Sequence, residues 1–176
     1  MKKFLILMIS VGILSCANNK TEQVSTIKIK DEKAQKISKM MESYVNNNFD
    51  SSIISEDAKI KFNQLEMTKT DFENLVNTHH AMFSEISFPE GWMETVNYIG
   101  ADVKNAGGNY AADYGSTWTS HWSDWTAVSK ISGDTISNHC FFGYKWKNDK
   151  IVEVSAIFPD EAFNKELAMF MEANKK

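Results

Sequence analysis

Residues 115–133 read GSTWTSHWSDWTAVSKISG, residues 135–146 read TISNHCFFGYKW and residues 151–158 read IVEVSAIF. Aromatic and β-branched side chains dominate all three segments, and short polar breaks separate them at 132–134 and 147–150. This pattern is typical of successive antiparallel strands joined by tight turns. The second break contains Asn148 and Asp149, which tolerate the positive φ of a hairpin turn. We therefore predict three long strands that form the wall of the domain.

Upstream of these strands, two segments carry apolar residues at helical spacing. The first is 31–47, where Asp31 is placed to cap a helix, and the second is 68–84, which begins with a capping box. Helices first and a strand-rich second half predict an α+β fold with a mainly antiparallel sheet. The sequence further predicts strands at 58–65 and 92–99, a mobile loop at 104–109, and a short amphipathic helix that begins after Pro159-Asp160.

Specific motifs in the strand-rich half indicate a family. The pattern Trp118-x-x-x-Trp122-x-x-Trp125, the run Tyr144-Lys-Trp146 and the run Ile157-Phe-Pro-Asp160 resemble nuclear-transport-factor-2-like (SnoaL-like) domains. The resemblance spans roughly residues 35–172 and is closest to bacterial lipoproteins of that superfamily. It implies a sheet curled into a cone around the N-terminal helices, with a pocket open at one end. It implies little about function, because this superfamily contains cyclases, isomerases, dehydratases and non-enzymatic binding domains.

The N-terminus has the organisation of a bacterial lipoprotein signal peptide. Lys2 and Lys3 precede a short apolar run that is too short to span a bilayer, and Ile13-Leu-Ser-Cys16 matches a lipobox. We expect a signal peptide at 1–15 and lipidation of Cys16; an ordinary secretory signal is the alternative. Ala17, rather than Asp, after the cysteine favours the outer membrane by analogy. Residues 16–30 are predicted to be a flexible tether and 31–174 a single cone domain.

Composition excludes several classes of partner. All 19 basic residues are lysine, so bidentate recognition of phosphate or carboxylate by arginine is excluded. The net charge is −4 and no basic stripe is present, which disfavours nucleic acid. His79, His121 and His139 lie on separate predicted elements without metal-ligand spacing, so we expect neither a metal nor a cofactor. With Cys16 lipidated, Cys140 is alone and an intramolecular disulfide is not expected.

The expected pocket depends on which way the strand at 117–128 faces. Trp118 and Trp122 lie on the more apolar of its two faces, and we predict that this face points inward. They would then form an aromatic wall for a flat apolar ligand or a sugar; filling of the core by both rings is the alternative. The complete set of residues predicted to line the pocket is His79, Trp118, Trp122, His139 and Tyr144.

Two residues are candidates for acid–base chemistry. His79 shares an apolar helical face with Leu75 and Val76, where burial should lower its pKa; a histidine hydrogen-bonded within the core is the alternative. Asp160 takes the place of the strand-end acid that abstracts a proton in the polyketide cyclases that the chain resembles. Pro159 stands between that strand and the acid, and the C-terminal Gln-Leu-Gly motif of those cyclases is absent. Asp160 also suits an ordinary helix N-terminus.

The interpretation that follows is a lipid-anchored envelope protein that binds a small apolar or amphipathic molecule, or a partner, without catalysis. The alternative is an acid–base enzyme of the cyclase, isomerase or dehydratase type, acting on a hydrophobic carbonyl compound. A third interpretation is a purely structural or homodimer-forming envelope module that fills its cone with its own side chains.

Overall fold

A computed structural model describes residues 25–98 and 116–175. The predicted signal peptide, Cys16 and the predicted loop at 104–109 lie outside these residues. None of the helices in the described ranges is long and apolar enough to cross a membrane.

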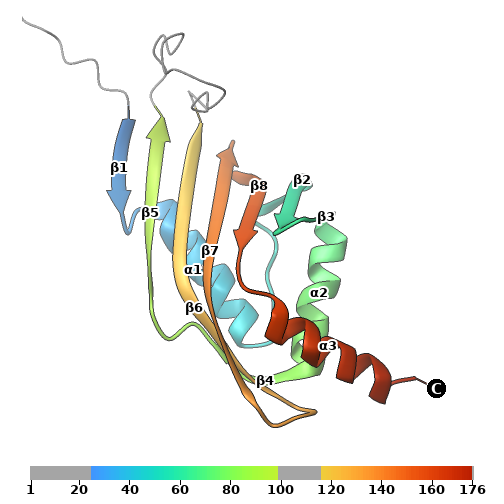
Figure 1. Ribbon diagram of the computed structural model, residues 1–176. Helices are drawn as coiled ribbons and strands as arrows, with labels where there is room; N and C mark the ends of the chain where they lie inside the picture. The colour runs from blue at the N-terminus through green and yellow to red at the C-terminus, as the bar shows by residue number, and fades with distance from the viewer. Residues whose placement is uncertain (1–24, 99–115, 176) are drawn as a thin grey trace, which may run out of the picture.

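The described residues form three helices and one eight-stranded sheet, whose order is β1-β5-β6-β7-β8-β2-β3, with β4 also paired to β6 (Figure 1). Every pairing is antiparallel except that of β2 with β8. The helices are α1 (Glu32–Val45), α2 (Lys69–Met82) and α3 (Glu161–Ala173). The strands are β1 (Ser25–Ile29), β2 (Ile54–Phe62), β3 (Leu65–Met67), β4 (Phe83–Ser87), β5 (Gly91–Tyr98), β6 (Thr117–Ser129), β7 (Thr135–Lys147) and β8 (Lys150–Ile157).

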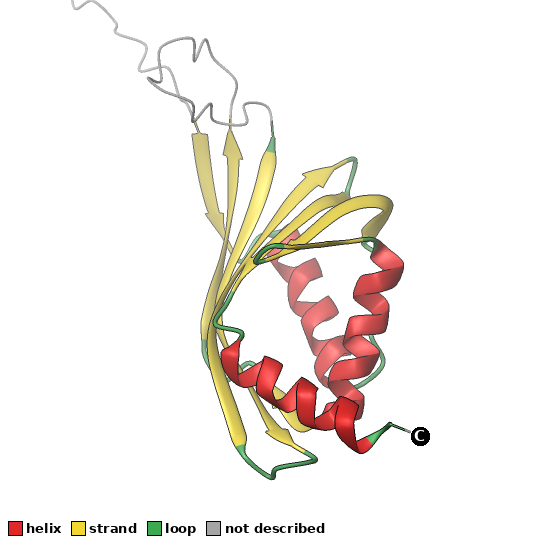
Figure 2. Ribbon diagram, turned by 45° about the vertical axis from the view of Figure 1, so that its right-hand side comes forward, coloured by secondary structure: helices red, strands yellow, loops and turns green. Residues whose placement is uncertain are grey.

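The sheet is strongly curved, and all three helices lie on its concave side (Figure 2). This arrangement is the predicted α+β fold with the cone that the family resemblance implies, and the sheet is left open rather than closed into a barrel. The core lies between the concave face and α1 and α2, where Ile37, Tyr44 and Val76 belong to one buried cluster with Val154 and Ala156 of β8.

Local sequence signals place both N-terminal helices as predicted. The Asp31 carboxylate accepts a hydrogen bond from the Ala34 N–H at 2.9 Å, which satisfies a free donor of the first turn of α1. Thr68 and Asp71 form a reciprocal capping box at the start of α2. The β7–β8 hairpin turns at Asn148 and Asp149, whose φ angles are 49° and 59°, so the predicted tight turn is confirmed.

The predicted orientation of β6 was wrong. Trp125, His121 and Ser123 are buried against the core, whereas Trp118 and Trp122 are half-buried on the convex face. The alternation itself was correct, but the less apolar face points inward. Small and hydroxyl side chains fit beneath α1, where their polar atoms bond one another: Thr119 Oγ1 lies 2.9 Å from Thr95 Oγ1 and accepts the indole N–H of Trp146.

The sheet is also wider than predicted. Part of the expected tether, Ser25–Ile29, is strand β1 and pairs with β5 from Ser25↔Tyr98 to Ile29↔Glu94. Its Ile27 and Ile29 side chains are exposed, so the strand depends on backbone hydrogen bonds to an edge and not on a buried face. β3 and β4, which lie at the two ends of α2, were not predicted either.

Candidate functional site

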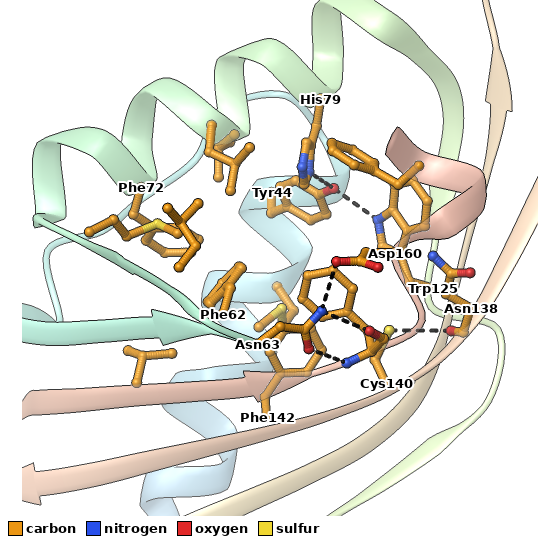
Figure 3. Close-up of a pocket in the computed structure, with 18 of the residues that line it drawn as sticks. Tyr44, Phe62, Asn63, Phe72, His79, Trp125, Asn138, Cys140, Phe142 and Asp160 are labelled. Atoms are coloured by element: carbon orange, nitrogen blue, oxygen red, sulfur yellow. Dashed lines mark hydrogen bonds between the residues drawn. The ribbon is translucent and has the colours of Figure 1, made fainter. Parts of the chain in front are cut away.

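A cavity of about 250 Å³ opens between the helices and the concave face of the sheet (Figure 3). α1 contributes Tyr44, α2 contributes Val76 and His79, β6 and β7 contribute the back wall, and α3 contributes Phe163. The lining is predominantly apolar, and among the residues that the structure describes it contains neither lysine nor arginine. Its residues are Met41, Tyr44, Phe49, Phe62, Asn63, Leu65, Met67, Phe72, Leu75, Val76, His79, Phe88, Trp125, Asn138, Cys140, Phe142, Tyr144, Val154, Phe158, Asp160, Phe163, Asn164 and Leu167.

Three of these side chains form a hydrogen-bonded chain. The indole Nε1 of Trp125 donates to the hydroxyl oxygen of Tyr44 at 2.9 Å, and that oxygen lies 2.9 Å from Nδ1 of His79 (Figure 3). The chain joins β6, α1 and α2, so it holds both helices to the sheet. Tyr44 also accepts a hydrogen bond at its backbone carbonyl from Nε2 of His80, at 2.6 Å.

Burial keeps this cluster uncharged. It lowers the pKa of His79 to about 4, and the neighbouring His80 acts in the same direction, so His79 is neutral at pH 7 as the sequence predicts. Burial also raises the pKa of the Tyr44 hydroxyl well above its usual range. The pKa of the Cys140 thiol rises to about 11 for the same reason, which leaves it protonated and a poor nucleophile.

Asn63, from the turn between β2 and β3, forms a separate polar group with the loop before α3. Asn63 Nδ2 donates to the Phe158 carbonyl at 2.9 Å and to the Asp160 carboxylate at 3.3 Å, and the Phe158 N–H donates to Asn63 Oδ1. Asp160 lines the cavity but is exposed, and it precedes α3 without a side-chain capping bond. The carboxylate is therefore at the edge of the cavity, bonded to an amide.

Only two of the five predicted pocket residues line the cavity. His79 does, and so does Tyr144, which is fully buried and whose hydroxyl has no hydrogen-bond partner among the described residues. Trp118, Trp122 and His139 lie on the convex face instead. The prediction fails for Trp118 and Trp122 because the orientation of β6 is reversed. It fails for His139 because this residue lies five positions before Tyr144 on β7, so the two side chains point to opposite faces of the sheet.

On the convex face these residues contact one another. The Trp122 ring stacks on that of Trp92, on the neighbouring strand β5, with ring centroids 5.9 Å apart. It also stacks on the ring of His139, on the other neighbour β7, at 6.3 Å. His139 Nδ1 lies 2.7 Å from the Asp124 carboxylate. Because Trp92 is 57% exposed, this row of rings is in contact with solvent and not with the cavity.

Sequence reasoning missed Tyr44 and Trp125 as functional residues. Tyr44 falls in the apolar periodicity of the helix predicted at 31–47, and Trp125, three residues after Trp122, falls on the face of 117–128 that the sequence predicts to point outward. The useful signal is that each carries a polar atom on a buried aromatic ring, which needs a partner in the interior. Among the described residues, no group of three or more His, Cys, Asp or Glu side chains is placed to hold a metal ion.

The geometry defines an α+β cone with an internal apolar cavity, and comparison with solved structures places it among known folds. A candidate polyketide cyclase from Xanthomonas campestris pv. campestris is similar over 78% of this chain and 96% of its own, with a TM-score of 0.54 and 10% identity. AclR, a candidate hydroxylase from Streptomyces galilaeus, is similar over the same shares, with a TM-score of 0.53 and 12% identity. An NTF2-like protein of unknown function from Burkholderia pseudomallei is similar over 77% of this chain and 96% of its own, with a TM-score of 0.52 and 8% identity.

These similarities confirm the predicted NTF2-like (SnoaL-like) fold. At such low sequence identity they establish the fold alone. No family model matches the chain, and no curated protein matches it.

Proposed function

We propose that this protein binds a small, neutral, predominantly apolar molecule in the cavity and does not transform it. The observation that carries the proposal is the cavity itself, about 250 Å³ of space lined by aromatic and aliphatic side chains with few polar atoms. Ligand pockets have this composition, and their volumes begin at about 300 Å³ for drug-sized molecules. A ligand of two or three fused or linked rings at most suits a space of this size.

Of the described residues inside the cavity, none is suited to act as an acid–base catalyst. His79 Nδ1 is engaged by the Tyr44 hydroxyl, and the lowered pKa of His79 makes it a weak base. The Cys140 thiol is protonated. The one carboxylate among the described lining residues, Asp160, is exposed at the edge.

Filling the cavity tests the proposal. Val76 is 4% exposed and lines the cavity, so Val76→Trp should occupy ligand space and weaken binding of the neutral dye N-phenyl-1-naphthylamine at least tenfold. Asn77→Trp is the matched control, because Asn77 is exposed on the same helix, and it should bind the dye as the unmodified protein does. Dye fluorescence gives the affinities.

Overpacking can cost about 1–3 kcal/mol, so thermal unfolding must first show that Val76→Trp is folded. Two results would count against a ligand-binding cavity: no dye uptake by the unmodified protein, or equal affinity in a folded Val76→Trp variant.

An acid–base enzyme acting on a hydrophobic carbonyl compound is the second candidate. Asp160 lines the cavity shortly after the last strand, β8, which ends at Ile157, and a similar fold occurs in a candidate polyketide cyclase. An enzyme of this kind would exchange the protons next to the carbonyl of a bound ketone for deuterium in D₂O. If the protein makes this exchange faster than it is in buffer, and the Asp160→Asn variant loses that acceleration, the result would favour this function over binding alone.

We propose further that Cys16 is lipidated and holds the domain at the bacterial envelope, at the outer membrane. The support is the sequence Ile13-Leu-Ser-Cys16 after a short apolar run. Cys16→Ala should leave an unprocessed or mislocalised precursor, read by gel mobility and by fractionation of membranes. Normal processing and unchanged membrane partitioning of the variant would refute lipidation at this residue.

A further inference from the structure

The hydrogen-bonded chain Trp125–Tyr44–His79 has a fixed direction. An indole N–H can only donate, so the Tyr44 oxygen is the acceptor in its 2.9 Å contact with Trp125. The Tyr44 hydroxyl proton is then free to be donated elsewhere. Nδ1 of His79, also at 2.9 Å, is the acceptor within reach.

The reverse arrangement leaves a buried donor unsatisfied. If His79 carried its proton on Nδ1, the Tyr44 oxygen would accept from both neighbours and its own proton would have no acceptor among the described residues. Tyr44 is 6% exposed, and an unmade hydrogen bond at such depth is costly. Neutral imidazole carries one ring proton, so Nδ1 accepts and Nε2 holds the proton.

This assigns a donor to the cavity. His79 lines the cavity, its ring packs edge-on against Phe163 at 5.1 Å between centroids, and it stays neutral because burial lowers its pKa to about 4. No described residue accepts a hydrogen bond from Nε2 in the structure. A neutral N–H group in apolar surroundings gains most from a ligand atom that accepts its hydrogen bond.

We propose that His79 Nε2–H recognises a neutral acceptor, the oxygen of a ketone, ester or ether, on an otherwise apolar ligand. Trp125 and Tyr44 are positioning residues, because they hold the tautomer that makes Nε2 the donor. The inference rests on ligand binding in the cavity and adds the chemical class of the ligand.

The same lining disfavours charged ligands. Among the described residues, neither lysine nor arginine lines the cavity, so a carboxylate placed beside His79 would lack a counter-ion. A cation at that depth would face a donor instead of an acceptor. The carboxylate of Asp160 is exposed and bonded to Asn63 at the edge.

Nitrogen-15 NMR of the histidine ring tests the tautomer without any ligand. At pH 7 the His79 signals should show a protonated Nε2 and an unprotonated Nδ1. Tyr44→Phe removes the donor to Nδ1 and should shift His79 toward a mixture of tautomers. A protonated Nδ1 in the unmodified protein would overturn the inference.

A matched pair of probes tests recognition. 2-Acetonaphthone and 2-isopropenylnaphthalene have nearly the same shape, and only the first offers a carbonyl oxygen. Competition against the naphthylamine dye should give roughly tenfold tighter binding of the ketone, the usual scale for one buried hydrogen bond. His79→Leu should abolish this preference while still binding the hydrocarbon, and His79→Gln, which keeps an N–H near the same place, should restore part of it.

The outcomes separate the two proposals. Failure of the unmodified protein to bind either naphthalene rejects the proposed function and the inference together. Equal affinity for the two probes rejects the role of His79 and leaves the cavity as a binding site. A preference that survives in His79→Leu likewise rejects the assignment to His79.

Discussion

Replacing Trp125 by alanine is expected to lower the free energy of unfolding by about 3–5 kcal/mol, the usual cost of truncating a large buried aromatic ring. Trp125 is 6% exposed, and its ring packs against Phe83 with centroids 5.3 Å apart. The change also removes the indole N–H that donates to Tyr44, so a buried hydroxyl loses a partner. Urea unfolding followed by circular dichroism gives the value.

Trp122→Ala is the matched control, because it makes the same substitution on the same strand but on the convex face. Trp122 is half-buried and packs mainly against Trp92 and Phe141, so the expected cost is about 1 kcal/mol. A larger loss from Trp122→Ala than from Trp125→Ala would mean that β6 faces the opposite way in solution.

Much of the architecture follows from local sequence signals. Asp31 and Thr68 begin α1 and α2 because the side-chain oxygen of each reaches a free N–H group of the first turn. This is a short-range effect. Asn148 and Asp149 form the β7–β8 turn because both adopt positive φ at low cost. The long aromatic and β-branched runs then pair in register as neighbouring strands.

The direction in which a strand faces is not a local property. Both faces of β6 carry apolar groups, and the choice depends on what packs above each one. Thr119 and Ser123 are fully buried on the inward face, whereas Trp118 and Trp122 are half-buried on the convex face. A hydrophobicity count on one strand misses this, because the inward face is defined by contacts with elements far away in the sequence, such as the hydrogen bond from Trp125 to Tyr44 of α1.

The candidate site was predictable only in part for the same reason. The helical spacing correctly placed His79 and Tyr44 on core-facing sides of their helices. Their contact depends on how α1 and α2 cross, and the contact of Tyr44 with Trp125 depends on the orientation of β6. The cavity itself arises from space between elements, which no periodicity encodes.

Two histidines that are shielded from water predict a steep loss of stability in mild acid. Burial lowers the pKa of His79 and that of His121 to about 4 each, whereas the pKa of histidine in an unfolded chain is about 6.5. Between these values the unfolded state binds more protons, so the free energy of unfolding falls as the pH falls. The slope should reach about 1.4 kcal/mol per pH unit for each histidine, and the two together should cost roughly 3–4 kcal/mol between pH 7 and pH 5.

This window can be separated from the effect of the carboxylates. Hydrogen bonds lower the pKa values of Asp50, Asp57 and Asp71 below 3.8, so their protonation destabilises the protein only at more acidic pH. Urea unfolding at half-unit steps from pH 7.5 to 4.5 measures the slope, and His79→Gln should reduce it by about half, because His121 still titrates. A slope near zero above pH 5, or one unchanged in His79→Gln, would show that His79 has nearly the same pKa in the folded state as in the unfolded chain. The neutral donor assigned to the cavity would then not persist in mild acid, so this measurement also sets the pH range over which His79 can discriminate between ligands.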